Sequence, residues 1–270
     1  MPRIIRPVTV DDPRVRDYAL VADPELVCRR GLFVVEGRLV VERLVAARRY
    51  TIHSMLLSDA AMVALAAVVE RLDESVPVYV CAVQEMLRLT GLNIHRGCLA
   101  LVERPEPRSV DSVLAAARTL VVLEGVANPD NVGGIFRNAA AFGAEAVILS
   151  PTCCDPLYRK AIRTSMGATL SVPYARATAW PADLQQLREA GFVVAALTPR
   201  APSQTIGEFV RRGRPQRIAV LFGTEGAGLT VGACELADRR VRIPVVEAVD
   251  SLNVAVAAGI VMSRLAEPAE

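Results

Sequence analysis

Short apolar runs alternate with longer segments of helical period from residue 32 onward, and this alternation constrains the fold more than any other feature. Such a pattern is typical of a parallel or mixed sheet whose faces are covered by helices. The sequence therefore predicts an α/β protein. Hydrophobic residues make up 52% of the 270 positions, which is enough for a sizeable core and excludes a disordered or low-complexity chain.

A proline-rich break divides the pattern into two domains. In Arg104-Pro105-Glu106-Pro107-Arg108, each proline fixes φ, lacks an N–H and keeps the preceding residue out of the helical region. We expect a small α/β domain over residues 1–108 and a second over 109–270. The expected strands are 32–35, 55–57, 78–80 and 99–102, then 120–123, 146–149, 193–197, 218–222 and 241–243; the expected helices are 38–48, 59–71, 83–89, 131–142, 156–164, 182–190 and 251–265.

The charges nearly cancel, because 31 basic residues face 29 acidic ones. Total charge therefore predicts neither a nucleic-acid partner nor its absence. The distribution is less even, since residues 156–217 hold ten Arg or Lys against three Asp or Glu. A solvated arginine-rich surface gives this pattern, and so does a surface that contacts a phosphate backbone.

No apolar run reaches the roughly 20 residues that a membrane span needs. The opening Met1-Pro2-Arg3 is not followed by the apolar core of an export signal, so we expect a cytoplasmic protein that binds no membrane. Six cysteines include no C-x-x-C pair, and only two histidines accompany them. We therefore expect reduced, mostly buried cysteines and no metal site.

A predicted helix with two early glycines follows the strand that ends near residue 123. Asn128-Pro129 is a turn opener, and either Asp130 or Asn131 can cap the helix. The glycine pair 133–134 weakens a helix, so it requires an explanation. Close approach of another backbone, a ligand or a second subunit would supply one. Arg137 lies one to two turns beyond the cap, and the plain alternative is an exposed arginine on an ordinary helix.

A glycine-rich loop, Gly223-Thr224-Glu225-Gly226-Ala227-Gly228, follows the strand predicted over 218–222. A nucleotide phosphate site is the first interpretation to weigh for such a loop. The G-x-x-G-x-G spacing fits it badly, no Gly-Lys-Ser/Thr is present, and Glu225 would repel a phosphate held by the loop amides. The loop suits a ligand that is neutral or positively charged near Glu225.

The last motif runs from Ile243-Pro244 to the start of the final helix. Ser251 is the predicted N-cap of that helix, and the small residues 255, 257, 258 and 259 allow another helix or backbone to come close. Asn253 is polar in an otherwise apolar first turn. It is either a surface residue or a residue at the carboxyl ends of the strands, where ligands bind in open α/β sheets.

Taken together, N-P-D-N-V-G-G-I-F-R, G-T-E-G-A-G and I-P-(x6)-S-L-N-V resemble the three signature motifs of the SpoU family of RNA ribose 2′-O-methyltransferases. The front of the chain resembles that family's small substrate-binding domain, both at Arg29-Arg30 before Phe33-Val34-Val35-Glu36-Gly37 and at residues 91–97. The resemblance is dense over residues 120–260 and looser over 28–108.

This resemblance implies an S-adenosylmethionine-dependent homodimer with a carboxyl-terminal trefoil-knotted α/β domain. By position it implies that Gly223, Ile243 and Leu252 contact the cofactor, with Leu197 or Thr198 as a weaker match. It also implies that Arg137 is the catalytic arginine and that Asn128, Glu225 and Asn253 occupy the other polar signature positions. The implied reaction is methyl transfer to a ribose 2′-hydroxyl.

Arginine is too basic to accept a proton at pH 7 unless its site is strongly perturbed. We therefore expect Arg137 to orient the ribose phosphate and to stabilise developing alkoxide. We expect Asn128, Glu225 and Asn253 to hold the loops and Arg137 in place. The chain departs from the family pattern at Glu247, where a glycine is common, and at Ala255, where a serine is common.

The substrate expected from this resemblance is structured RNA. Arg29, Arg30, Arg48 and Arg49 in the first domain, with Arg159 and Arg163 in the basic stretch, are the expected RNA contacts, because RNA is commonly recognised by shape and phosphate. The separate docking domain favours ribosomal RNA. A transfer-RNA ribose methyltransferase and a non-catalytic RNA-binding relative are the alternatives, whereas the absence of G-x-G-x-x-G disfavours a nicotinamide-dependent oxidoreductase.

Overall fold

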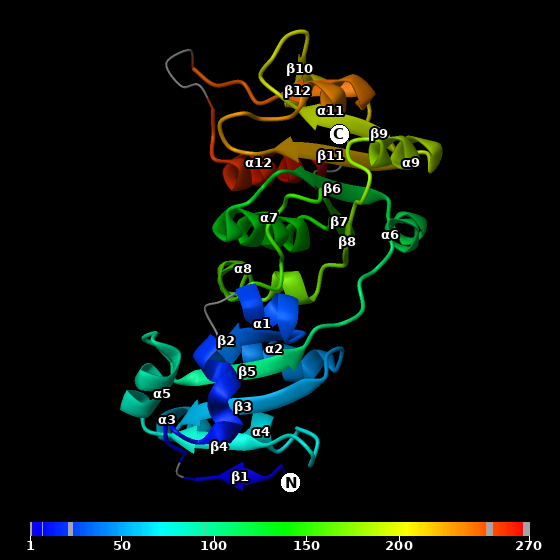
Figure 1. Cartoon of the computed structure of the whole chain (residues 1–270). Helices are drawn as coiled ribbons and strands as arrows, with labels where there is room; N and C mark the ends of the chain where they lie inside the picture. Colours follow the sequence, from blue (N-terminus) through cyan, green and yellow to red (C-terminus); the bar gives the residue numbers. More distant parts are fainter. Residues whose placement is uncertain (1, 7, 21–23, 95, 247–250, 267–270) are drawn as a thin grey trace. The chain divides into compact units, whose positions relative to one another are not determined.

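The computed structural model describes residues 2–6, 8–20, 24–94, 96–246 and 251–266 (Figure 1). The chain divides into two compact units. Unit 1 comprises Met1–Glu106 with Leu157–Leu170, and unit 2 comprises Pro107–Pro156 with Ser171–Glu270. The division falls within the proline-rich segment. Residues 157–170, expected in the second domain, instead pack with the first one.

Unit 1 is built on a five-stranded mixed sheet in the order β1-β4-β3-β5-β2. β5 runs antiparallel to both β2 and β3, whereas β1, β3 and β4 are parallel. The bounds are β1 Ile4–Ile5, β2 Leu32–Glu36, β3 Ile52–Ser58, β4 Val78–Cys81 and β5 Cys98–Glu103. The helices are α1 Pro24–Arg29, α2 Arg38–Ala47, α3 Asp59–Ala64, α4 Ala66–Val69, α5 Val83–Thr90 and α8 Arg159–Thr164, with 3₁₀ turns at Pro13–Leu20 and Ala168–Leu170.

Unit 2 is built on a seven-stranded sheet in the order β10-β12-β9-β11-β6-β7-β8, and every pair in it is parallel. Its strands are β6 Thr119–Glu124, β7 Ala146–Leu149, β8 Tyr174–Arg176, β9 Val193–Leu197, β10 Gln204–Thr205, β11 Ile218–Gly223 and β12 Arg239–Arg242. Its helices are α6 Val110–Ala116, α7 Pro129–Ala141, α9 Asp183–Glu189, α10 Ile206–Arg211, α11 Val231–Leu236 and α12 Val254–Ala266.

The central strands β6 and β7 of unit 2 are buried along their whole length and mostly apolar, because helices cover both faces of the sheet. All six residues of β6 and all four of β7 are buried, as expected for strands with parallel neighbours on either side. The sequence predicts five strands here, and the described residues of unit 2 form seven. The two additional strands, β8 and β10, are only three and two residues long, too short to show an apolar run.

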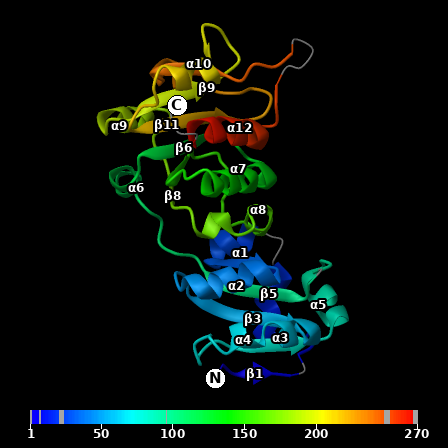
Figure 2. The same cartoon turned by 180° about the vertical axis from the view of Figure 1, so that it is seen from behind.

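The strand order of unit 2 changes direction at β6. The chain passes from β6 through β7 to β8 on one side, and then returns to β9 on the far side of β11. Because the sheet is parallel, the carboxyl ends of β6, β9, β11 and β12 lie along the same edge. Figures 1 and 2 both show α12 beside α7, and α12 also contacts β11.

The described part of the chain has no helix long and apolar enough to cross a membrane. It also holds no group of three or more His, Cys, Asp or Glu side chains placed to share a metal ion. All six cysteines are free thiols, and five of them are buried. Burial raises the pKa of Cys98 and of Cys154 to about 12, so both are protonated and unreactive near neutral pH.

Candidate active site

A pocket of about 260 Å³ opens at the carboxyl ends of β9, β11 and β12 in unit 2. We call it the strand-end pocket. Its walls come from the loop after β9, the loop after β11, the segment after β12 and the first turn of α12. The lining residues are Leu197, Thr198, Pro199, Arg200, Phe222, Gly223, Thr224, Glu225, Gly226, Ala227, Gly228, Leu229, Arg242, Ile243, Val245, Ser251, Leu252, Val254 and Ala257.

The loop Gly223–Leu229, which forms one wall, folds back tightly on itself. A Cβ added to Gly223 would lie 2.4 Å from the carbonyl carbon of Gly228, so only glycine fits there. The N–H of Gly228 donates to the carbonyl of Thr224 at 3.1 Å, which closes the turn. Gly226 and Gly228 have φ of 81° and 71°, in the left-handed region that glycine favours. The glycine spacing is therefore set by backbone geometry.

An amide bridge ties the glycine-rich loop to the two helices beside it. The Asn253 Nδ2 donates to Glu225 Oε1 at 2.7 Å and to Asn131 Oδ1 at 2.9 Å. Asn131 is buried near the start of α7, Glu225 lies in the loop after β11, and Asn253 precedes α12. The three signature motifs thus meet at one point, and we call Asn131–Asn253–Glu225 the amide bridge.

Asn253, and not Ser251, caps the last helix. Its Oδ1 accepts from the N–H of Ala255 at 2.9 Å and from that of Val256 at 3.3 Å. The expected cap was wrong because α12 begins at Val254, three residues later than predicted. Ser251 instead lines the strand-end pocket.

The first helix of the site, α7, begins at Pro129, two residues earlier than expected. Asn128 is the N-cap of α7, and its Oδ1 accepts from the N–H of Asp130 at 2.9 Å. This leaves Asn131 free of capping and able to join the amide bridge. Asn131 is one of the residues that the sequence did not assign to the site, because its role depends on Asn253, which lies 122 residues away in the chain.

Close packing of α7 against α12 explains the second glycine of the pair 133–134. A Cβ on Gly134 would lie 2.9 Å from the Cβ of Ala255. Four residues further along α7, Asn138 Nδ2 donates to the carbonyl of Ala255 at 2.7 Å, and its side chain would also meet a Cβ on Gly259. Both helices therefore need small residues at the crossing. Glu247, the other departure from the family pattern, lies outside the described residues.

The expected site residues fall into two groups. Gly223, Ile243, Leu252, Leu197 and Thr198 all line the strand-end pocket, as does Glu225. Arg137 and Asn128 do not line it. Arg137 is exposed on α7, and within the described residues its guanidinium has no hydrogen bond or ion pair.

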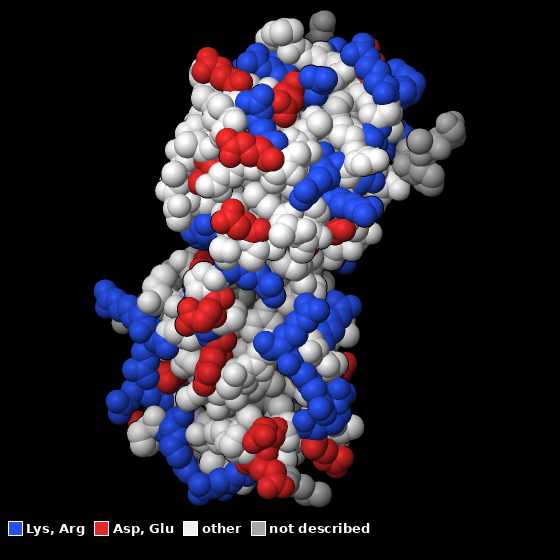
Figure 3. Space-filling model, turned by 90° about the vertical axis from the view of Figure 1, so that its right-hand side faces the viewer, with Lys and Arg blue, Asp and Glu red and all other residues white. Residues whose placement is uncertain are grey.

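The arginines expected to contact RNA are mostly exposed in unit 1. Arg29, Arg48, Arg49 and Arg163 are exposed, and Arg30 pairs with Asp17 at 2.7 Å. Arg159 differs, because its side chain is only 16% exposed and forms an ion pair with Glu36. Its role in the structure is to attach α8 to β2, so we withdraw it from the expected RNA contacts. Figure 3 shows basic side chains in bands on unit 1 with acidic ones between them.

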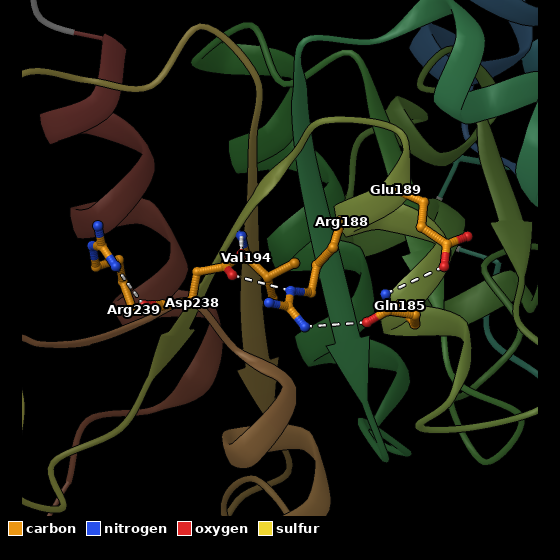
Figure 4. A network of polar contacts seen from close by, with 6 residues as sticks. All are labelled: Gln185, Arg188, Glu189, Val194, Asp238 and Arg239. Atoms are coloured by element: carbon orange, nitrogen blue, oxygen red, sulfur yellow. Dashed lines mark hydrogen bonds and ion pairs between the residues drawn. The ribbon is translucent and has the colours of Figure 1, made fainter.

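Part of the local excess of basic residues over 156–217 is used inside the protein. Arg188 Nε donates to Asp238 Oδ1 at 3.0 Å, while Asp238 Oδ2 accepts from the N–H of Val194, which ties α9 to β9 (Figure 4). Arg176 donates to the carbonyls of Ser150, Pro151 and Cys153, and Arg217 to those of Leu114 and Ala117. The excess is thus only in part a free basic surface.

Comparison with known proteins gives three findings. The model of the SpoU rRNA Methylase family matches residues 118–263. An uncharacterized tRNA/rRNA methyltransferase of Mycobacterium bovis is 42% identical over 255 residues, which are 93% of this chain and 87% of that protein. A second uncharacterized tRNA/rRNA methyltransferase, from Synechocystis, is 38% identical over 146 residues, or 54% of this chain and 52% of that protein.

Solved structures are similar over both units. An AdoMet-bound rRNA methyltransferase from Sinorhizobium meliloti superposes with a TM-score of 0.80 at 25% identity and covers 97% of both chains. The SpoU methyltransferase AviRb from Streptomyces viridochromogenes, in complex with AdoMet, has a TM-score of 0.79 at 23% identity and covers 95% of this chain and 98% of its own. The pocket, the bridge of three motifs and these matches lead to one conclusion: the chain belongs to the SpoU rRNA methylase family.

Proposed function

We propose that this protein is a methyltransferase that uses S-adenosylmethionine to methylate a ribose 2′-hydroxyl of RNA. The observation that carries the proposal is the amide bridge, which brings the three signature motifs together beside the strand-end pocket. The family match and the AdoMet-bound enzyme from Sinorhizobium meliloti support the cofactor and the RNA substrate.

The strand-end pocket has the chemistry that S-adenosylmethionine needs. Leu197, Ile243 and Leu252 offer apolar walls to an adenine ring, and the tight glycine loop offers exposed backbone groups to its polar edges. Gly223 lets the loop fold back this tightly, because a Cβ there would lie 2.4 Å from the carbonyl carbon of Gly228. The Glu225 carboxylate in the lining favours positive charge, such as a sulfonium, over phosphate.

When bound, S-adenosylmethionine supplies an activated methyl group on a positively charged sulfur. The chain's own residues then have to place the hydroxyl and help it lose a proton. We assign to Arg137 the orientation of the ribose phosphate and the stabilisation of negative charge on the 2′-oxygen. Its exposed guanidinium has no partner within the described residues, so it is available to RNA. The amide bridge fixes the position of Glu225 relative to α7, and Asn128 caps the start of that helix.

Ribosomal RNA is the substrate that we propose, with transfer RNA as the alternative. The Sinorhizobium meliloti enzyme is described as an rRNA methyltransferase, whereas the Mycobacterium bovis relative is described only as a tRNA/rRNA methyltransferase. We assign RNA docking to unit 1, through the exposed side chains of Arg29, Arg48, Arg49 and Arg163 and through Arg30.

We also propose a homodimer, a trefoil knot in unit 2 and a cytoplasmic location. The outer side of α12 supports a dimer, because Val256 is 53% exposed there and Phe142, just after α7, is 36% exposed. The knot is supported by the places of two successive elements: β12 lies beyond β9 in the sheet, yet α12 packs on α7. Light scattering tests the dimer, and a traced crystal structure tests the knot.

The function is tested by binding and transfer together. Calorimetry with S-adenosylhomocysteine should show binding, and ribosomal RNA from a strain lacking this gene should accept a radiolabelled methyl group on ribose. Arg137→Ala should abolish transfer while leaving S-adenosylhomocysteine affinity nearly intact. If the protein binds RNA but does not bind S-adenosylhomocysteine at millimolar concentration, it is a non-catalytic RNA-binding protein and the proposed enzyme function is wrong. Arg137→Ala with most of its activity would remove that arginine from the mechanism.

A further inference from the structure

The glycine-rich loop Gly223–Leu229 forms one wall of the strand-end pocket. Glu124 lies next to both ends of this loop. Glu124 is the last residue of β6, and in the parallel ladder it stands beside Gly223, the first residue of the loop. Its side chain is buried, with only 5% of the residue exposed. Glu124 itself does not line the strand-end pocket.

Three donors meet the Glu124 carboxylate. Oε2 accepts from the backbone N–H of Thr230 at 2.8 Å, and Oε1 accepts from the Thr230 hydroxyl at 2.8 Å. Oε1 also accepts from the indole N–H of Trp180 at 2.6 Å. A buried carboxylate is stable only when donors of this kind replace water. The three hydrogen bonds therefore fix the positions of Thr230 and Trp180 relative to Glu124.

Thr230 is the residue that follows the loop, and it also begins the next helix. Its hydroxyl accepts from the N–H of Ala233 and thereby caps α11. On the same helix, Gly232 lies against the ring of Pro181, the neighbour of Trp180. Glu124 therefore joins the end of the loop, the start of α11 and the segment before α9.

We propose that Glu124 is a positioning residue for the strand-end pocket, and the ligand it serves rests on the proposed function. The β6 backbone sets the place of Gly223, and the Glu124 carboxylate sets the place of Thr230. A loop whose two ends are fixed loses less conformational freedom when a ligand binds. Glu124 thus raises cofactor affinity without touching the cofactor.

Glu124→Gln tests this directly, because glutamine keeps the shape but turns one acceptor into a donor that faces another donor. We expect about tenfold weaker S-adenosylhomocysteine binding in calorimetry, the equivalent of one or two lost hydrogen bonds. The KM for S-adenosylmethionine should rise by a similar factor, while kcat at saturating cofactor changes little. RNA affinity should be unchanged.

Two matched variants separate positioning from general stability. Thr230→Ser keeps both bonds to Glu124 and should bind as the parent does. Trp180→Phe removes the third bond, away from the loop, and should lower the thermal midpoint more than it lowers affinity. If Glu124→Gln does not fold, Thr230→Val should still weaken binding, because it keeps the N–H bond to Glu124 but loses the hydroxyl bond, together with the cap of α11.

The result that overturns the inference is a Glu124→Gln or Thr230→Val protein that is less stable but binds S-adenosylhomocysteine with the parent's affinity. A fall in kcat with no change in KM would overturn it too. A parent protein that binds no S-adenosylhomocysteine would instead overturn the proposed function.

Discussion

At the scale of single residues, the Asn253 side chain makes two kinds of contact that serve different purposes. Its Oδ1 caps α12, and its Nδ2 forms the amide bridge to Asn131 and Glu225. Asn253→Ala removes both, so we expect a loss of about 2 kcal/mol in the free energy of unfolding, from the cap and from the unsatisfied Asn131 oxygen. Methyl transfer should fall as well. Urea denaturation and a transfer assay measure the two effects.

Asn253→Asp is the matched variant, because a carboxylate can still cap the helix but has no N–H to donate. It should keep most of the capping contribution and lose the amide bridge, with added repulsion from Glu225. Its transfer rate should fall about as far as that of Asn253→Ala. An Asp variant with the parent's rate would show that the bridge does not position the site.

The ion pair between Glu36 and Arg159 is a residue-scale feature of unit 1. Glu36 is 8% exposed and Arg159 is 16% exposed, and Arg159 Nε has no hydrogen-bond partner. Glu36→Ala would leave a largely buried guanidinium without its counter-ion, so we expect unit 1 to lose about 3 kcal/mol. Arg6→Ala, which breaks an exposed pair with Asp59 at 3.7 Å, is the control and should cost under about 1 kcal/mol. Equal urea midpoints for the two variants would contradict this.

At the scale of helices, the contact between α7 and α12 decides what Gly134 does. In an open helix Gly→Ala stabilises by about 1 kcal/mol. Here the new methyl would lie 2.9 Å from the Cβ of Ala255, so Gly134→Ala should instead destabilise the protein by about 1 kcal/mol. In an Ala255→Gly background the same substitution should be neutral or stabilising. Urea denaturation of the four proteins measures the coupling, and additive effects would exclude the contact.

The elements also show how far the sequence could predict this fold. The long apolar strands were predicted to within two or three residues, because burial on both faces gives them an unbroken apolar run. The short strands β8 and β10 were missed, since two or three residues carry no period. The cap of α12 was misplaced because Asn253 is selected by Asn131 and Glu225, which are 122 and 28 residues away.

The candidate site divides in the same way. Family resemblance predicted the pocket residues Gly223, Ile243 and Leu252, which the fold does bring together. Asn131, Asn138 and Glu124 have no local signal, because each owes its place to a partner from another motif or another strand. The number of arginines predicted a basic surface, but it could not show which guanidinium groups are used to bind carbonyls within the fold.

At the scale of the whole molecule, the reactivity of the buried thiols measures the unfolding of each unit separately. Cys81 and Cys98 are buried in unit 1, whereas Cys153, Cys154 and Cys234 are buried in unit 2. Cys28 is exposed. Because a buried thiol is shielded from reagents in solution, we expect a thiol reagent at pH 8 to modify Cys28 at once and the other five only as each unit unfolds. Native Cys28→Ser should show no fast reaction, and a second fast thiol would contradict the burial.

The same thiols make the stability of the whole molecule depend on alkaline pH. Burial raises the pKa of Cys98 and Cys154 from 9.0 to about 12 and that of Cys81 to about 11, so the unfolded chain loses these protons first. Their contribution is complete below pH 9 and is lost as the pH rises toward the folded values, by at most about 1.4 kcal/mol per pH unit for each thiol. Burial also raises the pKa of Tyr18, which acts in the same direction.

The urea midpoint should therefore fall between pH 9 and 10.5. Cys98→Ala should be less stable at pH 8 but show a shallower fall, whereas Cys28→Ala should follow the parent, and three parallel curves would rule out titration of the buried thiols as the cause.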